Sequence, residues 1–164
     1  MLTHTPLVFF LISALLLATV RSAQNGLCLI TRQDPDNCLS TSPVTFTVHD
    51  FTTFTPADGN PAPALVSFRY SNNMTLLVAH CSSRNDLVVD NDISALGENQ
   101  QVSFVYNSNN LTIIEDYIKC PTTAAQVVGF LDINTFCYPN NPPSPYGYGT
   151  KCITPSGSIS GSFS

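Results

Sequence analysis

The chain contains no tryptophan, few charged residues and no apolar run long enough to cross a bilayer. Of its 164 residues, 6 are Lys or Arg and 11 are Asp or Glu, which gives a formal net charge of −5. Nucleic-acid binding depends on a basic surface, so we expect no nucleic-acid partner. Hydrophobic residues make up 43% of the chain, which is too many for a disordered protein. Length and composition therefore predict one folded domain.

The longest apolar run lies near the N-terminus, where residues 7–20 carry no charge. A transmembrane helix needs about 20 apolar residues, so the run is too short for a membrane span and fits the core of a secretory signal peptide. Small residues follow at Ser22 and Ala23, and cleavage after either is compatible with the sequence. We expect residues 1–23 to be a signal peptide and the protein to be secreted and extracellular.

All the cysteines follow the predicted signal peptide, at Cys28, Cys38, Cys81, Cys120, Cys137 and Cys152. An even number in an oxidising compartment indicates disulfides. No Cys or His cluster has metal-ligand spacing, so we expect no metal and no cofactor. The spacing favours the pairs Cys28–Cys38, Cys81–Cys120 and Cys137–Cys152. A rival is a bridge from Cys28 to a second subunit, which would make a homodimer.

Two sequons agree with secretion. Asn73 is followed by Met74 and Thr75, and Asn110 is followed by Leu111 and Thr112. Both Asn residues lie in polar clusters between apolar alternating segments, where the tip of a hairpin is expected. The protein is therefore predicted to be a glycoprotein with acceptors at these two residues.

Apolar and polar residues alternate in several short segments, and no segment has helical periodicity. Val44, Phe46 and Val48 begin the first strand, and Phe51 and Phe54 break its alternation, which indicates a bulge or a bend. Two hairpins are expected around residues 66–81 and 102–120, and one more strand is expected at residues 125–131. The pattern predicts an all-β fold, an antiparallel β-sandwich or barrel built from hairpins and stapled by disulfides.

The domain is expected to span residues 24–154. Turn chemistry between Cys28 and Cys38 marks residues 24–43 as an N-terminal arm. Residues 155–164 are small and polar, and are expected to form a flexible tail.

The order and spacing of these segments resemble the Alternaria major-allergen family of fungal secreted β-barrel proteins. The similar segments are VTFTVHDF at 44–51, LVSFRYSNNMTLLVAHC at 65–81, the hairpin at 102–118, and the last strand with its Cys-flanked loop at 125–152. The family pairs the counterpart of Cys81 with a cysteine just before the next strand. Residues 96–99 hold no cysteine here, so Cys120 would replace that cysteine as the partner of Cys81. Cys28 would correspond to the cysteine that forms the family's intersubunit bridge.

This resemblance implies a secreted, non-enzymatic protein of the allergen or effector type. Such a protein modulates plant host defence, or is recognised by it, through surface binding. The implied partners are a host plant defence protein or a small phenolic ligand.

The residues themselves offer little catalytic chemistry. His49 and His80 fit strand-surface positions, and no nucleophile-elbow motif is present. Glu115 and Asp116 are adjacent on one predicted strand and point to opposite faces, so we interpret both as solvated acids. A loop with Asp86, Asp90 and Asp92 suggests calcium but lacks the glycine and terminal glutamate of an EF-hand. We expect no enzyme, and a hydrolase assembled across strands is the least favoured alternative.

Three tyrosines lie in or beside the Pro-rich loop between the last two cysteines, namely Tyr138, Tyr146 and Tyr148. Tyrosine offers a flat amphipathic face, so the loop is a candidate platform for a partner or a glycan. The alternative is that the rings pack on the prolines of a stapled loop, and we favour this over a platform. A glycan platform would make the chain an extracellular cell-wall or glycan-binding β-sandwich protein, which is the second hypothesis for its function.

Overall fold

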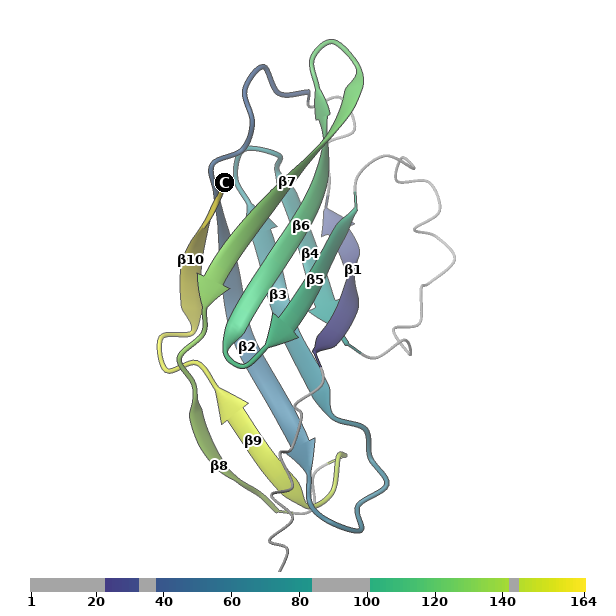
Figure 1. Ribbon diagram of the computed structural model, residues 1–164, viewed down its shortest axis with the longest axis vertical. Helices are drawn as coiled ribbons and strands as arrows, with labels where there is room; N and C mark the ends of the chain where they lie inside the picture. Colours follow the sequence, from purple (N-terminus) through teal and green to yellow (C-terminus); the bar gives the residue numbers. More distant parts are fainter. Residues whose placement is uncertain (1–22, 33–37, 84–100, 142–144) are drawn as a thin grey trace, which may run out of the picture.

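The computed structural model describes residues 23–32, 38–83, 101–141 and 145–164 (Figure 1). The predicted signal peptide up to residue 22 and the loop with Asp86, Asp90 and Asp92 lie outside the described residues. The strands are β1 (Gln24–Arg32), β2 (Thr45–Pro56), β3 (Leu65–Asn72), β4 (Leu77–Ser82), β5 (Val102–Asn107), β6 (Asn110–Lys119), β7 (Thr123–Asp132), β8 (Phe136–Asn140), β9 (Gly149–Ile153) and β10 (Ser158–Phe163).

These strands form a closed antiparallel barrel with one projecting hairpin. Neighbouring strands follow the order β10-β7-β6-β5-β1-β4-β3-β2, and β10 also pairs with β2, which closes the ring. β9 pairs with β2 and β8 pairs with β9, so this hairpin extends the sheet beyond the ring at the lower end of Figure 1. The predicted all-β, antiparallel, disulfide-stapled fold is confirmed, and of the two architectures left open the structure is the barrel.

Alternation places the core inside the ring. Along β6, Leu111, Ile113, Glu115 and Tyr117 are buried, and the residues that alternate with them are half-exposed. Aromatic rings from other strands meet them, including Phe46, Phe51, Phe68, Tyr70 and Phe104. Each large apolar side chain buried in this way contributes about 1.5–3 kcal/mol relative to exposure. The hydrophobic pattern therefore specifies which face of each hairpin turns inward.

β2 contains the bulge that its broken alternation predicts. Its register against β3 shifts between His49 and Thr52, and Asp50 has a φ of 54°. A bulge inserts one extra residue and moves the alternation by one. Phe51 is consequently buried in the core, and Thr53 follows on the same side of the strand. The bulge thus turns threonines toward the inner face at the end of the barrel.

Both ends of the predicted domain differ from expectation. Gln24–Arg32 is strand β1, which lies between β4 and β5, so the arm at 24–43 is wrong for its first part. Ser158–Phe163 is strand β10, so the flexible tail at 155–164 is also wrong. β10 forms the seam, where the ring of Phe46 lies against Gly161 and Gly129. Small residues are needed here because an aromatic ring covers them.

The disulfides correct two of the three favoured pairs. They are Cys28–Cys81, Cys38–Cys120 and Cys137–Cys152, so only the last pair is confirmed. Cys28 lies directly opposite Cys81 on paired strands β1 and β4. Leu39 bridges to Lys119, which brings Cys38 beside Cys120. The bridge from Cys28 to a second subunit and the replacement partner Cys120 for Cys81 are therefore both wrong.

Candidate functional site

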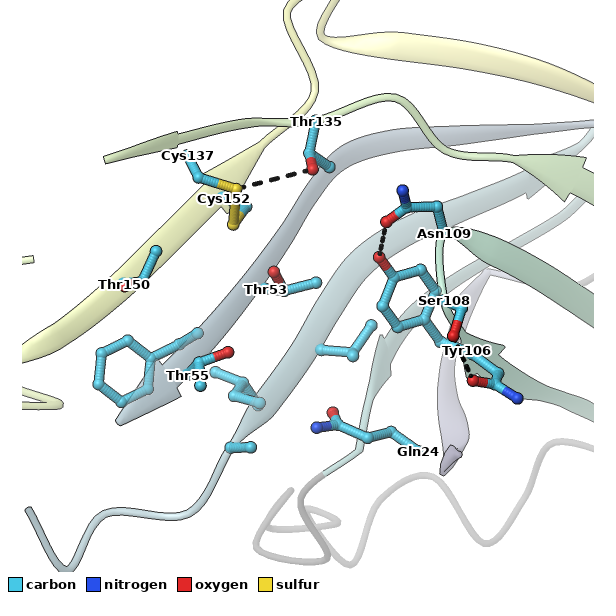
Figure 2. A pocket seen from close by; sticks show the side chains of 15 residues that line it. Gln24, Thr53, Thr55, Tyr106, Ser108, Asn109, Thr135, Cys137, Thr150 and Cys152 are labelled. Carbon is cyan, nitrogen blue, oxygen red and sulfur yellow. Dashed lines mark hydrogen bonds between the residues drawn. A yellow bond between two sulfur atoms is a disulfide. The ribbon is translucent and has the colours of Figure 1, made fainter. Parts of the chain in front are cut away.

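A cleft of about 440 Å³ opens at the end of the barrel that carries the β8–β9 hairpin (Figure 2). Its volume lies within the range of small-molecule sites, which often occupy barrel mouths. One wall comes from β2, β8 and β9, with Thr53, Thr55, Thr150 and the Cys137–Cys152 disulfide. The opposite wall comes from the β5–β6 turn and the start of β1.

The described lining of this cleft combines polar and apolar groups and includes no charged side chain. Hydroxyl groups come from Thr53, Thr55, Thr135, Thr150, Ser108 and Tyr106, and amide groups from Gln24, Asn107 and Asn109. The apolar part comes from Phe54, Ala64, Leu65 and Val66, and no Asp, Glu, Lys or Arg is among the described lining residues. Hydroxyl and amide groups both donate and accept hydrogen bonds. The cleft therefore matches an uncharged ligand that does the same.

The wall formed by the β5–β6 turn is held in place from several sides. Ser108 and Asn109 have φ values of 48° and 74°, as a two-residue hairpin turn requires. The Tyr106 hydroxyl donates to Asn109 Oδ1 at 3.2 Å, and the backbone amide of Ile133 donates to the Asn109 carbonyl at 2.7 Å. The Tyr106 ring packs on Phe51 at a centroid distance of 5.2 Å. Asn109 is therefore positioned before a ligand arrives.

The wall formed by the β8–β9 hairpin is anchored on its outer side by Asn60. Its Nδ2 donates to the carbonyl oxygens of Tyr146 at 2.9 Å and Tyr148 at 2.6 Å. Its Oδ1 accepts from the backbone amide of Ala62 at 3.0 Å. This single side chain joins the loop after β2 to the loop before β9, and so fixes the hairpin that forms the cleft wall.

The three tyrosines of the predicted platform have separate surroundings. Tyr146 packs on Phe54 at 5.4 Å between ring centroids, and Tyr138 packs on Phe136 at 6.3 Å. Tyr148 is exposed. None of the three lines the cleft, although the strands that flank their loop do. The cleft residues carry no sequence motif, and only the closed barrel brings β2, β5 and β9 together.

A second polar group lies inside the barrel, around Glu115. This side chain is 0% exposed, so the interpretation of Glu115 as a solvated acid is wrong. The Tyr70 hydroxyl donates to Glu115 Oε2, and Asn72 Nδ2 donates to the same oxygen at 2.7 Å. Thr75 also lies beside the carboxyl group. Burial raises the pKa of Glu115 above its ordinary value, while the nearby Thr75 hydroxyl and the hydrogen bonds of Tyr70 and Asn72 oppose this rise.

Asp116 points the other way, as predicted for neighbours on a strand. It is half-buried on the outer side of β6 and accepts a hydrogen bond from Gln126 Nε2 at 2.8 Å. Its charge adds to the rise in the pKa of Glu115. The two carboxyl groups therefore do not form a catalytic pair on one surface.

The histidines lie on outer strand faces. His49 Nε2 is 3.0 Å from Ser71 Oγ across β2 and β3, and His80 is exposed on β4. Asp50, next to His49, contacts Arg69 at 3.7 Å. Neither His49 nor Ser71 lines the cleft. A ligand bound in the cleft would therefore not contact this Ser–His pair.

Both sequon asparagines are exposed. Asn73 lies in the turn between β3 and β4, and Asn110 is the first residue of β6. Asn110 Nδ2 donates to Asp132 Oδ1 at 3.1 Å. Their predicted positions at hairpin tips are confirmed, and their glycosylation stays a prediction.

Across the described ranges we find no helical segment with the length and hydropathy of a membrane span. Within the same ranges, no three His, Cys, Asp or Glu side chains gather as a metal site would require. Comparison of the chain with protein-family models, with curated proteins and with solved structures gave no match.

Proposed function

We propose that the chain is an extracellular binding protein without catalytic turnover, and that its cleft holds a small uncharged ligand rich in hydroxyl groups, such as a short glycan. The observation that carries this proposal is the uncharged lining of the cleft, in a protein whose net charge is −5. A charged ligand would leave its charge unpaired against this lining, which is unfavourable. A neutral polyhydroxylated ligand exchanges its hydrogen bonds with water for equivalent bonds to the cleft.

The rigidity of the walls supports the same proposal. Asn109 is held by Tyr106 and Ile133, and the opposite wall is stapled by Cys137–Cys152. Prearranged walls reduce the entropy lost on binding. This matters for sugars because each neutral hydrogen bond contributes only about 0.5–1.5 kcal/mol.

We expect isothermal titration against a panel of neutral oligosaccharides, with uncharged phenols as a second arm, to identify a ligand. Thr53→Val and Asn109→Ala should each weaken binding about two- to tenfold, because each removes one hydrogen-bonding group from the cleft. Tyr148→Ala, exposed and outside the lining, is the matched control and should bind as the parent does. Equal affinity of all variants, or no binding by any panel member, would reject the cleft as the site.

The role in plant host defence that the family resemblance implies is a further proposal. Infiltration of plant tissue with the oxidised mature chain should produce cell death or an oxidative burst, and reduced, alkylated protein should not. A double variant, Thr53→Val with Asn109→Ala, tests whether the cleft contributes. Equal responses to folded and unfolded protein would contradict recognition of the folded surface.

A further inference from the structure

Asn110 borders one wall of the cleft along the chain. It directly follows Asn107, Ser108 and Asn109, which line one wall. Across β6 and β7 it pairs with Asp132, and Thr135, three residues further along the chain, lines the cleft as well. The Asn110 side chain is exposed and is held toward β7 by its hydrogen bond to Asp132 Oδ1 at 3.1 Å. Residues that line the cleft therefore flank the Asn110–Asp132 pair on both strands. They directly precede Asn110 at the start of β6, and Thr135 follows Asp132 after β7.

Asn110 also satisfies the requirement for N-glycosylation, since Thr112 stands two residues after it. In this modification Nδ2 forms a bond to C1 of the first sugar and loses one proton. The bond from C1 to the pyrophosphate of a lipid-linked oligosaccharide breaks, and the lipid pyrophosphate leaves. One N–H remains on Nδ2, so the hydrogen bond to Asp132 can persist and fix the direction of the first sugar.

We propose that an N-linked glycan on Asn110 covers the mouth of the cleft and limits which ligands enter. This inference rests on the proposed function, because the cover matters only if the cleft binds a ligand. The attached sugars present hydroxyl groups, as the proposed ligand does, and Ser108, Asn109 and Thr135 can hydrogen-bond either one. Ligand and cover therefore compete for the same groups.

The second sequon supplies a matched control. Leu65 and Val66 at the start of β3 line the cleft, whereas Asn73 follows the far end of the same strand. A glycan on Asn73 therefore lies at the opposite end of the barrel. Thr112→Ala supplies a second control, since it removes the Asn110 sequon but keeps the Asn110 side chain and its bond to Asp132.

The test uses the full mature chain secreted from a glycosylating eukaryotic host. Hydroxyl-radical oxidation of Tyr106, followed by mass spectrometry, reports access to the cleft without any ligand. We expect oxidation of Tyr106 to rise several-fold in Asn110→Gln and in Thr112→Ala, and to stay at the parent level in Asn73→Gln. Affinity for the oligosaccharide found in the panel should rise in the same two variants.

Two results would overturn the cover: a peptide mass showing Asn110 unmodified, or equal oxidation of Tyr106 in all four proteins. A rise in oxidation without binding of any panel oligosaccharide would support the cover and reject the proposed function. The two failures are thus distinguishable.

Discussion

Replacing Glu115 by glutamine should keep the protein folded at neutral pH and remove a loss of stability that the parent shows as the pH rises. Burial raises the pKa of Glu115 in the folded state, so the folded protein holds this proton more tightly than the unfolded chain. The associated stability is complete below the unfolded value of about 4.3 and is lost as the pH rises through the higher folded value. Glutamine stays neutral and still accepts from Tyr70 and Asn72.

Urea unfolding between pH 4 and pH 9 measures this effect. The parent should lose stability toward alkaline pH, and the Glu115→Gln profile should be flatter. Asp116→Asn is the matched control, because Asp116 lies on the outer side of the same strand. The charge of Asp116 makes only a small contribution to the raised pKa of Glu115, so the profile of Asp116→Asn should stay close to the parent's. Parallel profiles for Glu115→Gln and the parent would show that Glu115 does not carry the effect.

Glu115→Ala separates the role of the proton from the role of the hydrogen bonds. It leaves the Tyr70 hydroxyl and Asn72 Nδ2 without their buried acceptor and opens a cavity between them. We expect a loss of about 3 kcal/mol at the acidic end of this range and a smaller loss toward alkaline pH, where the parent is itself destabilised. A loss as small as that of the glutamine variant would mean that these donors find other partners.

Replacing Gly161 by valine should break the closure of the barrel. A side chain at Gly161 would overlap the ring of Phe46, which is 1% exposed and packs on Phe163 at 4.9 Å between centroids. Phe46 also contacts Gly129 on β7, so its ring cannot move toward that strand. Overpacking of this kind costs about 3 kcal/mol or more where the surroundings cannot yield.

Urea unfolding and amide hydrogen exchange of β10 measure this change. Exchange at Ser160 and Ser162 should accelerate in Gly161→Val as β10 separates from β2. Ser160→Val is the matched control, because Ser160 is exposed on the same strand. Combining Gly161→Ala with Phe46→Leu should recover part of the stability that Gly161→Ala alone loses. Additive losses would show that the two residues do not interact.

The hairpins could be predicted because each keeps one strict alternation. The same alternation also predicts that Glu115 is buried, because it shares the buried register of Leu111, Ile113 and Tyr117. Its charge led to the solvated interpretation, although register decides burial wherever one face of a strand is covered. A carboxyl group can occupy this position because Tyr70 and Asn72 come from another strand, which the local sequence does not reveal.

The two strands at the ends of the domain were missed for different physical reasons. In β1, apolar residues fall on both faces, and Leu27 is 66% exposed, so no alternation is visible. In β10, the small residues that Phe46 requires resemble a linker. The disulfide errors follow from the first omission, because Cys28 meets Cys81 only when β1 lies against β4. The cleft could not be predicted, since its threonines and asparagines are ordinary strand and turn residues until the ring closes.

The position of β10 between β2 and β7 also means that the barrel can close only late in synthesis. β10 is the last of the described strands to be synthesised, and its partner β2 is among the first. Until β10 arrives, the backbone groups of β2 and β7 that it pairs with stay open, and open strand edges invite pairing with other chains. A nascent chain must therefore carry an incomplete ring through most of its synthesis, and protection from aggregation is needed longest at the edge of β2, which forms well before β7.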